Sequence, residues 1–211
     1  MSILVHPSYF ANVATWVAMV QAKELFFEIH DNYQKQTYRN RAYIYGANGR
    51  LALNVPVHFS QKKRQLYAEV KIANDEKWQS IHWKSLESAY KTSPYFEFYQ
   101  DDLRPIFEEK HEYIMSLNTK CFEILLECLQ IQIPYQPSKD FEKETSHDDY
   151  RPLINARKEL ELPLEPYTQV FSSKHGFLSN LSILDLIFNE GPNSLNYLES
   201  QSLQGIKEVL P

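Results

Sequence analysis

The sequence predicts a fold between α/β and α+β: a mixed sheet of about five strands, opened by a βαβ unit and covered by a helical C-terminal half. Two apolar runs flank a helical pattern within residues 2–29, an Asn-Gly turn separates two further runs, and most of the rest has helical periodicity. A chain of 211 residues is the size of one ordinary domain. We therefore expect a single domain over residues 1–211.

The βαβ unit comes first. Residues 2–5 form one apolar run, residues 9–23 follow the period of a helix, and residues 25–29 form a second run. Strands joined in this way are parallel, so both end at the same edge of the sheet. The loops at 6–9 and 30–35 should then face each other where open α/β sheets bind ligands.

A hairpin is expected next. Residues 41–45 and 51–57 flank Asn48-Gly49, a pair that supplies the positive φ values of a tight turn. The second strand should turn its alternate apolar side chains inward: Leu51, Leu53, Val55 and Val57. Another strand is expected over residues 65–72.

The later part of the chain is mainly helical. Asn74 or Asp75 can cap a helix that reaches Tyr90, a second helix starts at Tyr95, and a core helix extends from Ile114 to about residue 131. The charged, proline-bounded stretch around 135–152 is interpreted as a mobile loop, either a lid or a disordered segment.

Several classes of protein are disfavoured. A net charge of −5 argues against general nucleic-acid binding, and the basic run at 61–64 is interpreted as a solvated turn. No stretch approaches about 18 apolar residues, so we expect no transmembrane segment, and the N-terminal residues lack the pattern of a signal peptide. Cys121 and Cys128 lie too far apart along one helix for a disulfide, which favours reduced thiols and a cytoplasmic location. No metal or cofactor motif occurs, and the oligomeric state is left open.

The segment Asp31–Arg41 is the main candidate binding site, because it contains no aliphatic side chain. In an extended strand Arg39 and Arg41 would share one face, where guanidinium groups match a phosphate or carboxylate, and Lys35 adds a charge. An anionic small-molecule substrate is the expected partner. The alternative is an exposed strand whose arginines pair with acidic helices. The remaining candidate binding residues of the segment are Tyr33, Tyr38 and Asn40.

Three residues are candidates for proton transfer. His6 follows the first strand and could act as a base that Asp31 orients, with Tyr9 in the same loop. A histidine beside a proline is also common as a structural residue. His82 is the third candidate.

Two further groups could contribute to a site. Trp78 and His82 share a helix face, with Lys84 and Tyr90 nearby, which suits stacking on a ring; core packing is the alternative. Asp185 lies in an apolar helix, where a buried carboxylate needs partners. It could complete a capping box with Ser182 or hold an arginine of the site.

Blocks along nearly the whole chain resemble the WbqC-like protein family, and specifically its Bacteroidetes-type branch. The matching blocks are Tyr9-Phe10, residues 33–41, Asn48-Gly49, residues 55–57, Trp78 with residues 81–83, residues 89–90 and 93–96, residues 169–171 and 174–177, and residues 181–186 with 189–192. Lys35, Arg39, Asn40 and Arg41 match cleanly. Ala11 stands where the family usually has proline, and His6-Pro7 and Asp31 also depart from its usual residues.

The family takes its name from a gene of O-antigen polysaccharide clusters. The resemblance therefore implies a role in cell-surface glycan assembly and a transferase activity, such as glycyl or aminoacyl transfer to an amino sugar. Our hypothesis is a cytoplasmic transferase that acts on an anionic, sugar-phosphate-type or aminoacyl-donor substrate. The alternative is a non-catalytic binding or scaffold protein of the same pathway.

Overall fold

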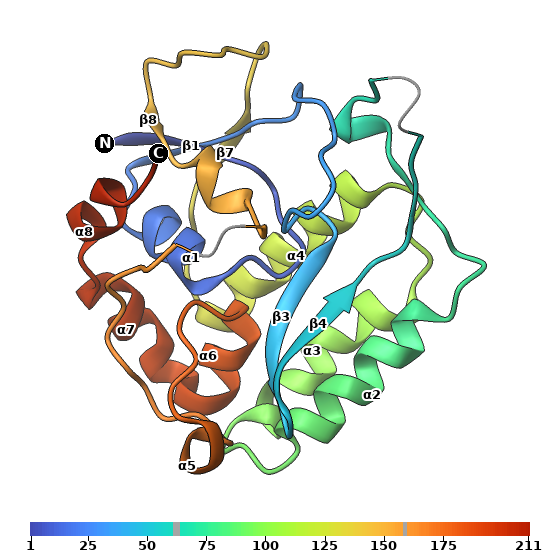
Figure 1. Ribbon diagram of the computed structural model, residues 1–211, viewed down its shortest axis with the longest axis vertical. Helices are drawn as coiled ribbons and strands as arrows, with labels where there is room; N and C mark the ends of the chain where they lie inside the picture. Colours follow the sequence, from blue (N-terminus) through green and yellow to red (C-terminus); the bar gives the residue numbers. More distant parts are fainter. Residues whose placement is uncertain (61–63, 158–159) are drawn as a thin grey trace.

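The computed structural model describes residues 1–60, 64–157 and 160–211, and it confirms the α/β class (Figure 1). Its main sheet has four parallel strands in the order β7-β2-β1-β8, and two antiparallel pairs, β3-β4 and β5-β6, lie outside it. The described strands thus form one parallel sheet and two small antiparallel sheets where one mixed sheet was expected.

The predicted βαβ unit is present. β1 (Ser2–Val5) pairs in parallel with β2 (Glu24–Phe27), and α1 (Val13–Val20) connects them. The helix begins later than residue 9 because Phe10 has a φ of 41°, which a right-handed helix excludes. Asn12 caps it instead, since its side-chain oxygen accepts from the Thr15 N–H at 3.0 Å.

The stretch expected to be a mobile loop contains both edge strands of the main sheet. β7 (Tyr135–Pro137) pairs with β2, and β8 (Asp148–Asp149) pairs with β1. The side-chain pattern did not predict these two short strands, because the edges of β1 and β2 need backbone partners, whatever side chains the partner carries. The mobility of the stretch stays a prediction. Residues 138–147 form the connection between the two strands.

The hairpin is confirmed as β3 (Arg41–Gly46) and β4 (Gly49–Asn54), with Gly49 at a φ of 98°. Leu53 and Val55 are buried, but Leu51 is 40% exposed, so the inward alternation holds only beyond the turn. The chain then enters β5 (Val57–His58).

The strand expected over 65–72 is mostly absent. A 3-10 turn, η1 (Tyr67–Glu69), precedes a short β6 (Lys71–Ile72) that pairs with β5. The turn buries the Tyr67 ring completely, and its hydroxyl donates to the Pro7 carbonyl at 2.8 Å. Residues 61–63 of the basic run lie outside the described residues.

Helices make up most of the remaining chain, as expected. They are α2 (Trp78–Tyr90), α3 (Phe96–Glu108), α4 (Ile114–Leu129), η2 (Arg151–Ile154), α5 (Ser172–His175), α6 (Ile183–Glu190), η3 (Gly191–Asn193), α7 (Ser194–Ser200) and α8 (Leu203–Glu208). Figure 1 shows α6, α7 and α8 gathered beside α1, and α2, α3 and α4 grouped on the other side of the molecule. Cys121 and Cys128 are buried free thiols, as predicted.

The start of α6 confirms only half of the expected capping box. Ser182 is the N-cap and accepts from the Leu184 N–H at 3.3 Å. The Asp185 side chain does not bond to Ser182. It bonds to residues of other segments, described below.

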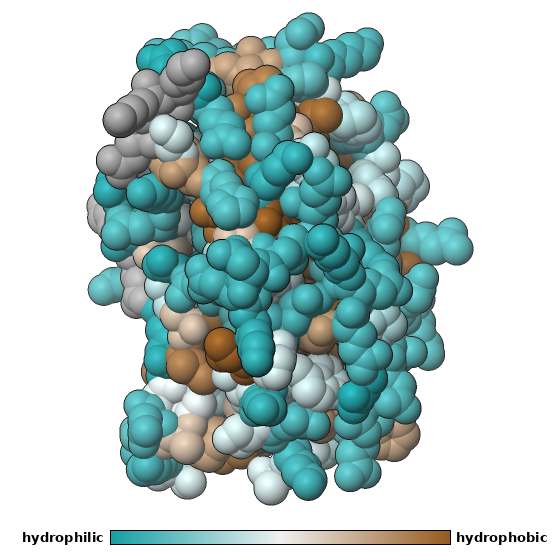
Figure 2. Space-filling model, turned by 90° about the vertical axis from the view of Figure 1, so that its right-hand side faces the viewer, coloured by the Kyte–Doolittle hydropathy of each residue, from teal (hydrophilic) through white to brown (hydrophobic). Residues whose placement is uncertain are grey.

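The surface is mainly hydrophilic on the side shown in Figure 2, where apolar atoms form small separate areas. Within the described ranges, no helix is long and apolar enough to cross a bilayer.

Candidate functional site

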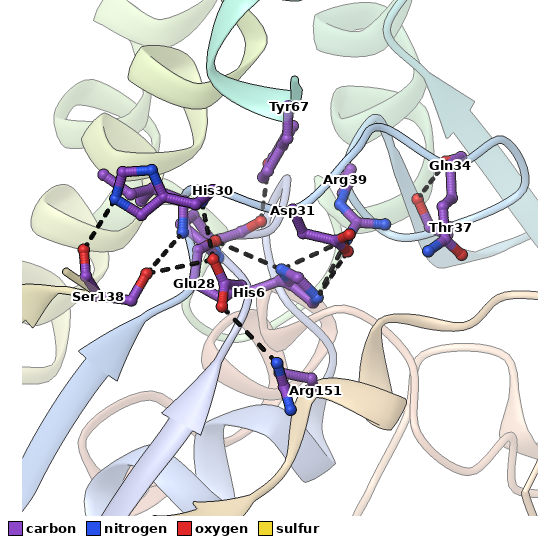
Figure 3. Close-up of polar contacts among 12 residues, drawn as sticks. His6, Glu28, His30, Asp31, Gln34, Thr37, Arg39, Tyr67, Ser138 and Arg151 are labelled. Carbon is purple, nitrogen blue, oxygen red and sulfur yellow. Dashed lines mark hydrogen bonds and ion pairs between the residues drawn. The ribbon is translucent and has the colours of Figure 1, made fainter. Parts of the chain in front are cut away.

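Polar side chains follow all four parallel strands at one edge of the sheet (Figure 3). His6 comes directly after β1, Glu28 after β2, Ser138 after β7, and Arg151 two residues after β8. Because parallel strands end together, residues distant in sequence become neighbours there. The predicted meeting of the first two loops is confirmed, with 3.5 Å between His6 Nε2 and Asp31 Oδ2.

Glu28, at the end of β2, contacts residues at the other three strand ends. Its carboxylate is fully buried and accepts from the Ser138 hydroxyl at 3.1 Å, and it lies 3.6 Å from the Arg151 guanidinium. Its backbone carbonyl lies 3.4 Å from His6 Nδ1. A carboxylate inside the protein needs such partners, so Glu28 fixes the relative positions of β1, β2, β7 and β8.

Arg39 lies at the centre of the site and is fully buried. Its Nη2 donates to Asp31 Oδ2 at 2.5 Å and to His6 Nε2 at 3.0 Å. Its guanidinium also lies over the Tyr67 ring, 5.1 Å from the centroid. Burial lowers the pKa of Arg39, and the neighbouring Tyr67 and Asp31 oppose that change.

Two nitrogens of Arg39, Nε and Nη1, have no hydrogen-bond partner among the described residues. Figure 3 shows the side chain between Asp31 and the loop that carries Gln34 and Thr37. A buried N–H without an acceptor costs about 1–3 kcal/mol, which favours an oxygen acceptor from a ligand. Both nitrogens are closed to solvent, so a ligand oxygen reaches them only when a neighbouring side chain moves aside.

His6 is a neutral imidazole at neutral pH. Burial lowers its pKa well below 6.5, and the Arg39 charge lowers it further. When Nδ1 carries the proton, it donates to the Glu28 carbonyl and Nε2 remains the acceptor that faces Arg39. His6 is therefore held in the basic form, which a proton acceptor requires.

A cavity of about 530 Å³, hereafter the His6 cavity, adjoins these residues. Its walls are the loops 31–39 and 151–157, which are joined by hydrogen bonds from the Tyr38 N–H to the Ile154 carbonyl and from the Ala156 N–H to the Gln36 carbonyl, at 2.8 and 3.1 Å. Its described lining carries the carboxylates Asp31 and Asp149 and five cationic side chains: Lys35, Arg39, Lys143, Arg151 and Arg157. The positive excess suits an anionic ligand.

Four of the sequence candidates line this cavity: His6, Asp31, Lys35 and Arg39. The expected pairing of Arg39 with Arg41 is wrong, because Arg39 precedes β3 and does not share its face. Arg41 instead donates to Asn54 and the Tyr43 hydroxyl, at 2.7 and 3.2 Å.

Three other residues of the segment serve packing or a neighbouring cavity. Asn40 donates to the Val55 carbonyl at 2.8 Å, and Tyr33 is buried against Phe59 and Tyr67. Tyr38 lines a second cavity on the opposite side of its own loop.

His82 lies in the core and does not line the His6 cavity. Its Nδ1 lies 2.9 Å from the Tyr9 hydroxyl and its Nε2 lies 3.1 Å from the Asn54 carbonyl, so both ring nitrogens have partners. Burial lowers its pKa to about 4. Trp78 is 3% exposed and meets both the Tyr9 and His82 rings edge to face, as core packing predicts, whereas Lys84 is exposed on α2.

Among the described residues, the Asp185 carboxylate accepts hydrogen bonds from two tyrosines and a glutamine, where one expectation was an arginine. Its fully buried carboxylate accepts from the hydroxyls of Tyr90 and Tyr167, each at 2.7 Å, and from the Gln169 amide at 2.8 Å. Burial raises the pKa of Asp185, and these three hydrogen bonds oppose the rise. These hydrogen bonds connect α2, α6 and the segment before α5.

Sequence reasoning missed Glu28, Arg151 and Asp149. Glu28 could have been found, since it is a charged residue directly after an apolar strand. Arg151 and Asp149 had no such signal, because β8 has no strand pattern in its side chains.

The fold and the cavity define an α/β protein with a polar, cationic site at the carboxyl ends of parallel strands. The chain belongs to the WbqC-like protein family, whose family model matches residues 7–162. It is also similar to a protein of Mycobacterium tuberculosis (strain ATCC 25618 / H37Rv) that is described as "Uncharacterized protein Rv1507c". The two are 28% identical over an alignment of 204 positions, and the alignment covers 82% of this chain and 87% of that protein. No solved structure matches the chain.

Proposed function

We propose that this protein is a cytoplasmic group transferase of cell-surface glycan assembly that binds an anionic substrate in the His6 cavity. The substrate class is a sugar phosphate, a nucleotide sugar or an aminoacyl donor. The observation that carries the proposal is Arg39, a fully buried guanidinium at the cavity with two nitrogens that lack protein acceptors.

The cationic side chains would bind the anionic group. Arg39 is preorganised by Asp31 and His6, so little side-chain entropy is lost when it donates to a ligand oxygen. Lys35 and Arg157 come from the two loops that are hydrogen-bonded to each other, are exposed, and would add charge to the cavity.

His6 would accept the proton of the attacking amine or hydroxyl at Nε2, after the substrate displaces the Arg39 N–H from that nitrogen. The phosphate or carrier that the attack displaces would leave as an anion held by the cationic side chains of the cavity. The lowered pKa of His6 keeps it neutral, and the Glu28 carbonyl orients the ring. Asp31 then acts through Arg39 as a positioning residue. The chain's membership of the WbqC-like family is consistent with the glycan context, which the resemblance implies through the family's name.

Calorimetric titration with inorganic pyrophosphate and with a panel of nucleotide sugars and aminoacyl donors tests the binding step. Lys35→Ala should weaken pyrophosphate binding about tenfold, the effect of one charge-assisted contact. The control is Lys110→Ala, which removes an exposed charge that lies outside the cavity lining. Absence of anion binding, or equal affinity in the Lys35 variant, would contradict the proposal.

Product analysis by mass spectrometry tests catalysis. His6→Gln keeps a neutral, polar side chain and should bind a reactive donor while losing turnover by about a hundredfold. A ligand that binds the wild-type protein but is never converted would favour the alternative, a non-catalytic binding protein of the same pathway.

A further inference from the structure

A second cavity of about 430 Å³, hereafter the Asn180 cavity, lies beside the His6 cavity. Asn155 and Leu160 line both. The divider is formed by the loops around residues 37–38 and 153–154. Thr37 and Ile154 line the His6 cavity, whereas their neighbours Tyr38 and Leu153 line the Asn180 cavity. The two cavities therefore adjoin at Asn155 and Leu160.

The Asn180 cavity presents oriented hydrogen-bond donors. The Asn180 side-chain oxygen accepts from the Ala14 N–H at 3.0 Å, and the Asn155 oxygen accepts from the Arg157 N–H at 2.9 Å. Since each oxygen is bound to backbone, each amide offers its NH₂ group. The Tyr38 hydroxyl accepts from Arg50 at 3.3 Å, which leaves its own proton to donate.

The N-terminus of α1 lies beside this cavity but adds no anion site. The first three helical N–H groups are bound to the Leu181 carbonyl, the Asn180 side chain and the Asn12 side chain. Six other lining residues are apolar: Leu153, Leu160, Leu162, Phe177, Leu178 and Leu181. The remaining ones are Asn12, Ser179 and two residues of opposite charge, Arg50 and Glu161, so the lining has no excess of either charge. Apolar walls with a few fixed donors suit an uncharged ring that carries oxygen acceptors.

We infer that the Asn180 cavity binds the uncharged, oxygen-rich ring of the same substrate whose anionic group occupies the His6 cavity. This inference rests on the proposed anion site. The ring is a pyranose or a pyrimidine, because both combine an apolar face with hydroxyl or carbonyl acceptors. The linkage between ring and anion passes Asn155 and Leu160, the residues that the cavities share.

Calorimetric titration with four probes tests the inference: inorganic pyrophosphate, UMP, UDP-glucose and the corresponding sugar phosphate. UDP-glucose should bind at least about tenfold more tightly than pyrophosphate, as expected for two or more added hydrogen bonds. If the Asn180 cavity binds the pyranose, the sugar phosphate should show the tighter binding. If the cavity binds the pyrimidine, UMP should show it.

Asn180→Asp is the diagnostic variant, because its carboxylate still accepts from the Ala14 N–H while the NH₂ donor is lost. It should weaken UDP-glucose binding about tenfold and change pyrophosphate binding less than about twofold. Tyr38→Phe, which removes only a hydroxyl, should act in the same direction. Asn196→Asp, at an exposed position of α7, is the matched control.

The possible failures are distinguishable. No pyrophosphate binding to the wild-type protein would overturn the proposed function. This inference alone would be overturned if pyrophosphate binds but neither ring increases the affinity. It would also be overturned if Asn180→Asp weakens the binding of pyrophosphate and of UDP-glucose equally. Free glucose or uridine that binds as tightly as its phosphate ester would show that the cavity serves a separate molecule.

Discussion

Arg39 is both a structural residue of the core and a candidate ligand-binding residue. It is completely buried, and its positive charge is balanced by Asp31 at 2.5 Å. The stacking over Tyr67 and the contact with His6 hold the guanidinium in one orientation. The geometry that would make it a ligand-binding residue therefore also makes it a structural one.

Replacing Arg39 should expose this structural role. Arg39→Met leaves the buried Asp31 carboxylate without its partner and should lower the free energy of unfolding by about 3–5 kcal/mol in urea titrations. The double variant Arg39→Met/Asp31→Asn should lose less free energy of unfolding than Arg39→Met, because it no longer contains the unpaired Asp31 carboxylate. Additive losses would show that the two residues are not coupled. Lys71→Met, which breaks the exposed pair with Glu112, should have a much smaller effect.

At the scale of elements, the boundary between α6 and η3 depends on Gly191. Its φ is 52°, and a Cβ atom built there would lie 2.5 Å from the Tyr95 ring. The close approach lets α6 pack on the start of α3, where Phe96 and Phe188 meet edge to face. Both the backbone conformation and the contact require the absence of a side chain.

Gly191→Ala should therefore be more destabilising than an alanine at another glycine with positive φ. Gly176 provides the control, because its φ is 75° and nothing lies within 4 Å of an added Cβ. Both variants carry a backbone cost of about 1–3 kcal/mol, and Gly191→Ala should add about 1–3 kcal/mol for the forced contact. Urea titrations measure both, and equal losses would mean that the Tyr95 ring moves aside freely.

At the scale of the whole molecule, buried histidines make the fold sensitive to acid. Burial lowers the pKa of His6, His82 and His111, that of His82 to about 4. In the unfolded chain a histidine takes up a proton near pH 6.5, whereas in the folded protein it does so only at lower pH. The unfolded state thus binds more protons, and stability falls as the pH decreases below about 6.5.

His82 alone should remove about 3 kcal/mol of stability between pH 6.5 and pH 4. The free energy of unfolding, measured in urea at a series of pH values, should fall less steeply over this range in His82→Gln than in the wild-type protein. The exposed His58→Gln is the control and should leave the slope unchanged. Identical slopes for His82→Gln and the wild type would contradict the assignment.

The sequence by itself determined the local elements and one edge of the site. Periodicity within 2–29 predicted β1, α1 and β2, and the geometry of parallel strands then predicted that the His6 and Asp31 loops meet, as they do at 3.5 Å. The hairpin around Gly49 and the capping of α6 by Ser182 also follow from local chemistry. These features depend on residues close together in the chain.

Only the tertiary structure decided the other half of the site. β7 and β8 form because β1 and β2 need backbone partners, and backbone hydrogen bonds leave no pattern in side chains. Arg151 reaches Glu28 only through that pairing, across 123 positions of sequence. Likewise, Arg39 leaves the face of Arg41 because it turns toward Asp31 and His6 before β3 begins. Long-range pairing and burial, which no local window contains, determine where these charges lie.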